Sequence, residues 1–153
     1  MTWEQDNKWE SDWWGDCVNT LREEFLQFAY AKRMGLQTYN DGRSDYNIDC
    51  IGQSVIDFGG GPISMLLKTK NAGAKTVVDP CQFPTWVAMR YGAAGINYLP
   101  VKAEEYDGGP IKQYDEAWIY NVLQHVVDPE KVLRVAQKTA KLIRIFEWID
   151  AGT

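Results

Sequence analysis

From residue 54 onward, short runs of β-branched and aromatic residues alternate with stretches in which apolar residues recur every three or four positions. The first pattern is typical of buried strands and the second of helices with one apolar face. The spacing predicts strands over Ser54–Phe58, Lys75–Asp79, Asn97–Val101, Glu116–Tyr120 and Leu142–Trp148. It predicts helices over Pro62–Asn71, over Pro84–Arg90 and from Pro129 to about Ala140, with Asp128 as the N-cap of the last one. This alternation predicts an α/β fold, a parallel sheet with helices on both faces.

The segment before the first strand has a different pattern. Apolar residues at helical spacing predict a helix over Asp16–Met34, with Asp16 as its N-cap and Gly35 as its C-terminal stop. A polar stretch follows, with a turn signal at Asp41-Gly42. A chain of 153 residues is long enough for one domain and too short for two. We therefore expect one domain over 1–153, made of an N-terminal helical segment (1–50) and a core (53–149).

Tryptophan is concentrated at the N-terminus. Four of the seven tryptophans lie in the first fourteen residues, at Trp3, Trp9, Trp13 and Trp14. So much aromatic surface is expected to pack rather than to stay in water. We expect Trp3 and Trp9 to pack against the domain or a partner. For Trp13 and Trp14, packing and a role as a lid over a ligand both stay open.

Polar residues follow four of the predicted strands at the point where each strand ends. Asp57 and a run of glycines follow the first strand, Asp79 ends the second, residues 102–104 follow the third and Asn121 follows the fourth. In open parallel sheets, ligands bind beyond the carboxyl ends of the strands. The sequence therefore predicts a ligand site at this edge of the sheet.

The turn after the first strand, SVIDFGGGPIS over 54–64, narrows the class of ligand. Its glycines let backbone N–H groups approach a ligand closely, and an acid on the next strand, Asp79, is placed to hold ribose hydroxyls. We therefore predict a nucleoside-containing cofactor. Gly59, Gly61 and Ser64 nearly match the dinucleotide fingerprint, which keeps NAD open. Asp57 counts against NAD, because a carboxylate there would repel a pyrophosphate and suits a cationic amino group.

Composition and charge exclude other classes of function. The net charge is −5 and no basic run is present, which argues against a nucleic-acid binder. No apolar run approaches membrane-spanning length, and no signal-peptide pattern opens the chain. The three cysteines are scattered, which favours free thiols in a reducing cytoplasm. His125 is the single histidine, and without a Cys/His cluster we predict no metal site.

Four segments resemble the motifs of one family, the class I S-adenosylmethionine-dependent methyltransferases. DFGGGP at 57–62 resembles the family's D-x-G-x-G glycine motif, and VVDP at 77–80 resembles its second motif. VKAEEYD at 101–107 resembles the stretch often written G-D-A-E-D-L, although Lys102 stands where the family often has an aspartate. YDEAWIYNVLQHVVDP at 114–129 resembles F-D-x-V-x-x-x-x-V-L-x-H-x-x-D-P over a long stretch. The resemblance implies a three-layer Rossmann-like sheet of about five strands in the order 3-2-1-4-5, and S-adenosylmethionine as the cofactor.

The resemblance also implies roles for individual residues. Asp57 and the glycine backbone would meet the methionine end of the cofactor, and Asp79 would hold the ribose hydroxyls. Ala103 and Glu104 would meet the adenine. The cofactor-binding set that we predict is Asp57, Gly59, Gly60, Gly61, Pro62, Asp79, Pro80, Cys81, Ala103, Glu104, Asn121, Val122 and Trp14.

Residues near the expected mouth of the site are candidates for contact with a methyl acceptor. His125 is the candidate catalytic residue, as a general base, and a structural role is the competing interpretation. Glu147 and Asp150 follow the fifth strand and are candidate acceptor contacts by position.

The chain departs from the family at its C-terminal end. A full class I sheet has seven strands, whereas this chain ends after the fifth, which leaves an apolar edge strand. Because uncovered edges pair with other chains, we expect a homodimer through this edge; the alternative is that the chain is a fragment of a longer natural protein. The leading hypothesis is a methyltransferase with an unidentified, small-molecule acceptor. The alternatives are a non-catalytic S-adenosylmethionine-binding module that acts through oligomerisation, and an NAD-linked oxidoreductase supported by the glycine spacing alone.

Overall fold

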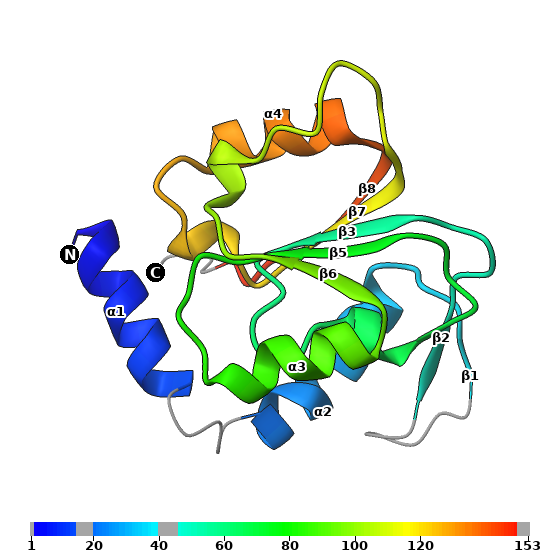
Figure 1. Ribbon diagram of the computed structural model, residues 1–153, viewed down its shortest axis with the longest axis horizontal. Helices are drawn as coiled ribbons and strands as arrows, with labels where there is room; N and C mark the ends of the chain where they lie inside the picture. The colour runs from blue at the N-terminus through cyan, green and yellow to red at the C-terminus, as the bar shows by residue number, and fades with distance from the viewer. Residues whose placement is uncertain (1, 15–19, 40–45, 150–153) are drawn as a thin grey trace.

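Five parallel strands form the central sheet of the computed structural model, which describes residues 2–14, 20–39 and 46–149 (Figure 1). The strands are β3 (Val55–Phe58), β5 (Lys75–Val78), β6 (Ile96–Leu99), β7 (Tyr114–Tyr120) and β8 (Ala140–Phe146). Their order across the sheet is β6-β5-β3-β7-β8, and every neighbouring pair is parallel. The predicted strand order 3-2-1-4-5 is confirmed.

Helices cover both faces of this sheet, as the alternating pattern predicts. The helices are α1 (Trp3–Trp14), α2 (Thr20–Arg33), α3 (Thr85–Ala93) and α4 (Pro129–Thr139), with short 3₁₀ turns η1 (Met65–Lys68), η2 (Ala103–Glu105) and η3 (Leu123–His125). Helix α4 lies on one face, and α2 and α3 lie on the other (Figure 1). Asp128 caps α4 as predicted, because its carboxylate accepts a hydrogen bond from the Lys131 N–H at 3.0 Å.

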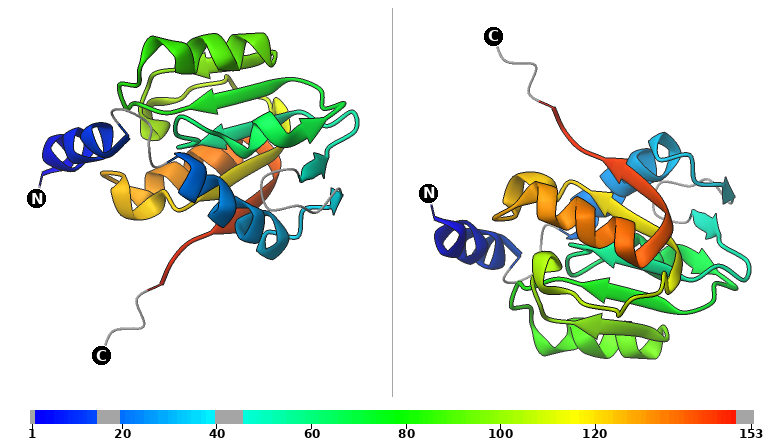
Figure 2. Two further views of the ribbon diagram at one scale, coloured as in Figure 1. Left: turned by 90° about the horizontal axis from the view of Figure 1, so that it is seen from below. Right: turned by 90° about the horizontal axis from the view of Figure 1, so that it is seen from above.

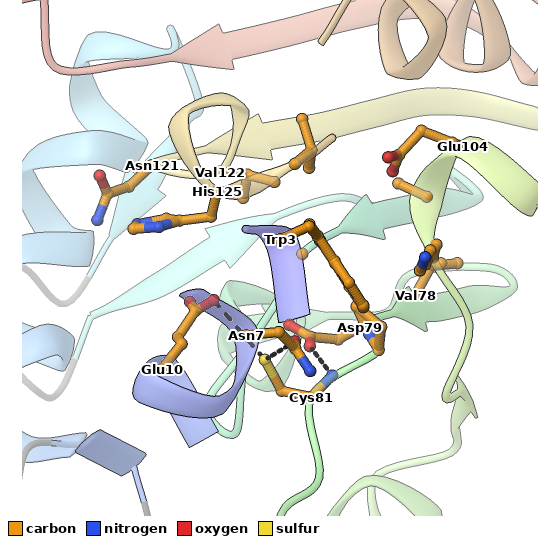
Figure 3. Close-up of a pocket in the computed structure, with 15 residues that line it drawn as sticks. Trp3, Asn7, Glu10, Val78, Asp79, Cys81, Glu104, Asn121, Val122 and His125 are labelled. Carbon is orange, nitrogen blue, oxygen red and sulfur yellow. Dashed lines mark hydrogen bonds between the residues drawn. The ribbon is translucent and has the colours of Figure 1, made fainter. Parts of the chain in front are cut away.

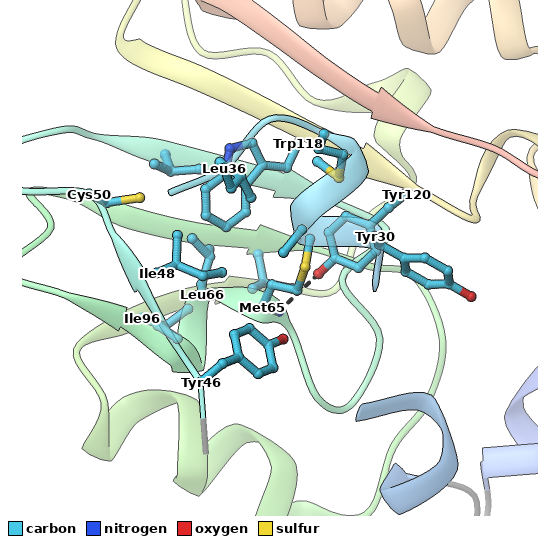
Figure 4. Close-up of a cluster of buried hydrophobic side chains, with 14 of the residues drawn as sticks. Tyr30, Leu36, Tyr46, Ile48, Cys50, Met65, Leu66, Ile96, Trp118 and Tyr120 are labelled. Carbon is cyan, nitrogen blue, oxygen red and sulfur yellow. Dashed lines mark hydrogen bonds between the residues drawn. The ribbon is translucent and has the colours of Figure 1, made fainter. Parts of the chain in front are cut away.

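The strands place alternate side chains into two apolar clusters. Along β3, Val55 packs into the cluster on the α2 and α3 face, whereas Ile56 and Phe58 pack under α4. Along β7, Trp118 points to the first cluster and Ile119 to the second. All five side chains are fully buried, so the sheet is apolar on both faces, as expected for parallel strands. Figure 4 shows the first cluster, with Trp118 among its members.

The predicted helix over Pro62–Asn71 is wrong. Ser64 caps the short turn η1 instead, and the chain then extends into β4 (Thr69–Lys70). Strand β4 pairs with β2 (Asn47–Asp49), which also pairs with β1 (Thr38–Tyr39), to form a small second sheet. This pairing replaces the helix because it provides hydrogen-bond partners for the Thr69–Lys70 backbone.

The N-terminal segment contains two helices. Helix α2 confirms the predicted helix from Thr20 to Arg33, and Gly35 ends it with a φ of 78°. The predicted N-cap Asp16 and the Asp41-Gly42 turn lie outside the described residues. Helix α1 was not predicted as a helix; it lies at the opposite end of the molecule from β1 and β2 (Figure 2). Among the described residues, no helix is long and apolar enough to cross a membrane.

Strand β8 is one edge of the central sheet. Leu142 and Ile145 on this strand are 46% and 44% exposed. Arg144 lies between them and forms a two-pronged ion pair with the buried Glu116 of β7, with N–O distances of 2.9 and 3.0 Å. The edge is therefore tied to its neighbour by a buried charge pair and presents apolar side chains on its outer part.

Candidate functional site

The glycine turn after β3 has a conformation that requires glycine. Gly59 and Gly61 have φ values of 78° and 68°, in the left-handed region that other residues avoid. A Cβ atom on Gly59 would lie 2.5 Å from a methyl carbon of Val122, which follows β7. The turn therefore packs directly against the exit of β7, as close backbone approach requires.

Asp57 supports this turn from below. The side chain is fully buried and accepts hydrogen bonds at Oδ2 from the hydroxyls of Ser64 and Tyr120. A Cβ atom on Gly60 would lie 2.8 Å from the same oxygen. Burial raises the pKa of Asp57 to about 7, and repulsion from Asp79 acts in the same direction, against the two hydrogen bonds.

Asp57 lines neither of the two cavities described below, and its Oδ1 is buried without a hydrogen-bond partner among the described residues. The carboxyl group therefore supports the turn, and its contact with the methionine end of a cofactor, directly or through water, stays a prediction. The sequence could not separate the two roles, because Tyr120, which binds the buried oxygen, lies on a different strand.

Tyr91 of α3 anchors the other side of the turn. Its hydroxyl donates a hydrogen bond to the Gly61 carbonyl and accepts one from the Ser64 N–H at 2.9 Å. The side chain is fully buried. The turn is thus held from β7 and from α3, which gives a preformed floor for a ligand.

Two cavities lie above this floor, at the carboxyl ends of the central strands. The first cavity has a volume of about 40 Å³ and is lined by Trp3, Asn7, Glu10, Gly59, Val78, Asp79, Pro80, Cys81, Lys102, Ala103, Glu104, Asn121, Val122, His125 and Val126 (Figure 3). The second cavity has a volume of about 270 Å³ and is lined by Trp9, Glu10, Trp14, Glu23, Gln27, Gly59, Gly60, Gly61, Pro62, Ile63, Tyr120, Asn121, Gln124 and His125. Every residue of the predicted cofactor-binding set except Asp57 lines one of them.

Asp79 lies at the inner wall of the first cavity. Its Oδ2 accepts a hydrogen bond from the Gly61 N–H at 2.8 Å, and its Oδ1 accepts one from the Cys81 N–H at 2.9 Å. Burial raises its pKa above the usual value, and the two backbone donors oppose this rise. Each carboxylate oxygen has a second lone pair, so Asp79 can still accept hydrogen bonds from a ligand.

Glu104 and Lys102 form the opposite part of the first cavity. One carboxylate oxygen of Glu104 accepts a hydrogen bond from the Val127 N–H at 3.2 Å. The Lys102 ammonium lies 3.9 Å from the centre of the Trp3 ring, a cation–π contact that connects this loop to α1. The predicted adenine contacts, Ala103 and Glu104, are thus close to the N-terminal helix.

Helix α1 contributes residues that the sequence did not identify. Asn7 and Glu10 point into the first cavity beside Trp3, toward Asp79 and Cys81 (Figure 3). The Cys81 thiol donates a hydrogen bond to Asn7 Oδ1 at 3.1 Å. The spacing of residues 3, 7, 10 and 14 puts all four on one helical face, and this mixed polar and aromatic periodicity is the signal that could have found them.

Gln27 of α2 is a second residue that the sequence did not identify. Its amide nitrogen donates a hydrogen bond to the Ile63 carbonyl at 2.6 Å, whereas its Oε1 is buried and has no partner among the described residues. Gln27 is 2% exposed and lines the second cavity. A buried carbonyl oxygen without a donor is costly, so a ligand that donates an N–H there would be stabilised.

His125 lines both cavities. Its Nδ1 lies 3.2 Å from a carboxylate oxygen of Asp6, and its Nε2 lies 3.2 Å from the side-chain nitrogen of Gln124. Since an amide nitrogen only donates, Nε2 accepts and the ring proton lies on Nδ1, facing Asp6. The arrangement is that of a histidine oriented by an acid, with Asp6 supplied by α1.

Glu147, another candidate acceptor contact, binds backbone groups of the turn after β7. Glu147 Oε1 accepts hydrogen bonds from the N–H groups of Val122 and Leu123, at 2.9 and 3.0 Å. Glu147 therefore caps the turn after β7 and lines neither cavity. Asp150 lies outside the described residues. Within the described part of the chain, no group of three or more His, Cys, Asp or Glu side chains is arranged to hold a metal ion.

Comparisons with known proteins were made by sequence and by structure. No family model matches the chain, and no curated protein matches it in sequence. Solved structures do match. One is an S-adenosylmethionine-dependent methyltransferase from Thermotoga maritima, described as a possible histamine N-methyltransferase, with a TM-score of 0.51 and 19% identity, over 85% of this chain and 58% of that chain.

Two further structures share the fold. The [4+2]-cyclase SpnF has a TM-score of 0.59 and 19% identity, over 85% of this chain and 47% of its own. A Haloferax volcanii complex that contains the Trm112 methyltransferase activator matches with a TM-score of 0.57 and 17% identity, over 89% of this chain and 55% of that chain. The chain thus spans about half the length of the solved structures it matches.

These comparisons establish the architecture. The chain has the Rossmann-like fold of class I S-adenosylmethionine-dependent methyltransferases, as its strand order and helical layers also show. A methyltransferase and a cyclase both occur on this fold. The fold therefore does not define the reaction, which depends on the residues of the site.

Proposed function

We propose that this protein binds S-adenosylmethionine in the two cavities and transfers its methyl group to a small nucleophilic acceptor. The observation that supports this most is the position of Asp79. It is a buried carboxylate on the cavity wall, beside a preformed glycine turn and at the end of the strand next to β3. An acid at this place in a Rossmann-like sheet suits the two hydroxyls of a ribose.

In this proposal the two ends of the cofactor occupy different cavities. The adenosyl group lies in the first cavity, with its ribose on Asp79 and its adenine near Ala103 and Glu104. The methionine group lies over the glycine turn in the second cavity. There the unpartnered Oε1 of Gln27 would accept a hydrogen bond from the amino group of the cofactor.

Entry of the cofactor requires a shift of α1. Small-molecule sites usually measure about 300–1,000 Å³, whereas the first cavity is reduced to about 40 Å³ by the side chains of α1 above it. Trp3 and Asn7 lie over this cavity, and Trp14 at the other end of the helix is 7% exposed and lines the second. We infer that the side chains of Trp3 and Asn7 move off the cavity in this shift, while Asp6 stays beside His125 and Trp14 stays at the second cavity.

The share of the protein in the reaction is alignment, exclusion of water and proton removal. The bound cofactor supplies an activated methyl group on a sulfonium. Helix α1 covers the site, and His125, oriented by Asp6, accepts a proton from the acceptor at Nε2 once Gln124 has moved aside. NMR of the single histidine checks this tautomer: in the neutral ring, the ¹⁵N shifts should show the proton on Nδ1, and a proton on Nε2 contradicts this role.

Binding calorimetry tests the proposal without knowledge of the acceptor. S-adenosylmethionine, S-adenosylhomocysteine and NAD are titrated in turn, and we expect the first two to bind and NAD to bind weakly or not at all. Asp79→Ala should weaken both adenosyl ligands by at least about tenfold, because charge-assisted hydrogen bonds contribute about 1.5–3 kcal/mol. The exposed Glu105→Ala is the control and should bind as the wild type does.

Two outcomes would contradict the proposal. A preference for NAD would favour an oxidoreductase, and unchanged affinity in Asp79→Ala would remove the ribose contact. Turnover with candidate acceptors then separates an enzyme from a binding module that does not transfer the methyl group.

We also propose that the protein forms a homodimer through the β8 edge and acts in the cytoplasm. The exposed Leu142 and Ile145 support the first point, and the free, buried thiol of Cys50 fits a reducing compartment. Light scattering on the wild type should give the mass of a dimer, and the double variant Leu142→Lys/Ile145→Lys should give that of a monomer. A monomeric wild type contradicts the dimer and leaves the cofactor site unaffected.

A further inference from the structure

Of the residues that the structure describes, four line both cavities: Glu10, Gly59, Asn121 and His125. In S-adenosylmethionine, the sulfur atom joins the adenosyl group to the methionine chain. If these two parts occupy the two cavities, the sulfur lies where the cavities meet. Glu10 is the one acid among the four, and it comes from α1, above the glycine turn.

Glu10 is surrounded by titratable groups from several elements. Asp79 faces it from the end of β5, His125 from η3 and Asp6 from its own helix. Its Oε2 lies 3.7 Å from the Cys81 sulfur, whose single proton it shares with the closer Asn7 Oδ1. Glu23 of α2 lines the second cavity with it. Lys102 also lines the first cavity, where its ammonium lies over the Trp3 ring, 3.9 Å from the ring centre. The groups that act most on the Glu10 carboxyl include two acids, Asp79 and Asp6, so a cation in the cavity would be attracted to this acidic group of side chains.

We propose that Glu10 faces the sulfonium of the bound cofactor and makes the site prefer the charged methyl donor over the neutral product. This inference rests on the proposed function. A carboxylate attracts a sulfonium strongly in a site that excludes water, and it has no such attraction for the thioether of S-adenosylhomocysteine. The loss of positive charge on methyl transfer would therefore weaken binding and help the product to leave.

The environment of Glu10 makes this preference depend on pH. Burial raises the pKa of Glu10 to about 7, and repulsion from Asp79 and Asp6 adds to this, whereas His125 and the Cys81 thiol act in the opposite direction. The carboxyl is thus mostly neutral at pH 6 and mostly ionised at pH 8. A bound cation favours the ionised form, so the donor should release protons from Glu10 on binding near pH 7, and the product should not.

Calorimetry of the full chain with S-adenosylmethionine and S-adenosylhomocysteine, at pH 6 and pH 8, tests the inference. In the wild type, the ratio of donor affinity to product affinity should rise by about tenfold from pH 6 to pH 8, which is about 1.4 kcal/mol. Glu10→Gln should remove this rise and leave the affinity for the product unchanged. Glu4→Gln, an exposed change on the same helix, is the matched control and should behave as the wild type does.

A second measurement isolates Glu10 from the amino group of the ligand, which also titrates. Titration at pH 7 in buffers of different ionisation enthalpy gives the number of protons released. The wild type should release more protons than Glu10→Gln with the donor, and the two should release the same number with the product. Glu10→Asp keeps the charge and should keep part of the preference.

The outcomes separate this inference from the proposed function. If neither ligand binds the wild type, the proposed function fails and the inference fails with it. If both ligands bind and Glu10→Gln keeps the wild-type ratio at both pH values, the inference is overturned and the proposed function stands. If Glu10→Gln loses both ligands equally, Glu10 supports the site as a whole and does not recognise charge, which also overturns the inference.

Discussion

Replacement of the glycines in the turn after β3 gives a graded test of how that turn is built. Gly59→Ala and Gly61→Ala both place a side chain in the left-handed region, at φ values of 78° and 68°, which costs about 1–2 kcal/mol each. The two positions differ in the space around them. A Cβ on Gly59 would lie 2.5 and 2.6 Å from the two methyl carbons of Val122, whereas a Cβ on Gly61 has Trp14 as its nearest neighbour, at 3.9 Å.

This difference sets the expected magnitudes. Forced overpacking of a buried position costs about 1–3 kcal/mol, so Gly59→Ala should lower the free energy of unfolding by about 2–5 kcal/mol in total. Gly61→Ala should lower it by about 1–2 kcal/mol, through backbone strain alone. Urea denaturation, followed by circular dichroism, measures both values. Both positions are glycine in the sequence, so the larger loss at Gly59 is predicted by its contact with Val122 and not by residue type.

A double-mutant measurement tests the contact between Gly59 and Val122. Val122→Ala removes the two methyl carbons that the new Cβ would meet, so the loss from Gly59→Ala should be smaller in a Val122→Ala background by at least about 1 kcal/mol. The loss from Gly61→Ala should be the same in both backgrounds. Equal losses at the two glycines in the wild type, or an unchanged loss at Gly59 in the Val122→Ala background, would show that the turn does not pack on the β7 exit as described.

Three further outcomes follow from buried polar groups. Glu116→Ala leaves the half-buried Arg144 without its carboxylate partner and should lower the free energy of unfolding by about 3–5 kcal/mol in urea denaturation. The control Glu130→Ala breaks an exposed pair with Arg134 and should lower it by less than about 0.5 kcal/mol; equal losses contradict the reasoning. Burial raises the folded-state pKa of Asp57 to about 7, so between pH 4 and 7 the folded state keeps a proton that the unfolded state loses. The free energy of unfolding should therefore fall as the pH rises from 4 to 7, and Asp57→Asn should flatten this fall. An unchanged slope in Asp57→Asn contradicts this role of Asp57. Gln27→Met should weaken the affinity for S-adenosylmethionine by about three- to tenfold in calorimetry. It should leave the affinity for 5′-methylthioadenosine, which lacks the amino acid group, unchanged; an equal loss for both ligands contradicts contact between Gln27 and the amino group.

The central sheet was predictable because its signals are local. Each strand lies in a short, mainly apolar run, and α4 begins at Pro129 with Asp128 as its N-cap, two residues whose conformational preferences are strong. These features predict the parallel sheet, and the family resemblance adds the strand order. The strand ends also predicted many of the residues that line the two cavities, since residues at the carboxyl ends of parallel strands meet at one edge.

What the sequence did not predict depends on contacts between distant segments. The segment around Thr69 is a strand because it pairs with Ile48, which no local pattern reveals. Asp57 is buried because Ser64 and Tyr120 bind it, and the motif position alone does not distinguish a buried support from a ligand contact. The positions of Asn7 and Glu10 at the first cavity depend on where α1 lies. The aromatic residues of this segment predicted that it packs, but not which surface it packs against.

The position of α1 has a practical consequence. One side of the first cavity comes entirely from residues 3, 7 and 10, while the sheet and its two apolar clusters contain no residue from this helix. A shortened protein that begins at residue 15 would be expected to keep its folded core and lose that wall. An assay on such a protein would report on the part of the site that lies outside α1, and low affinity there would say nothing against the intact molecule.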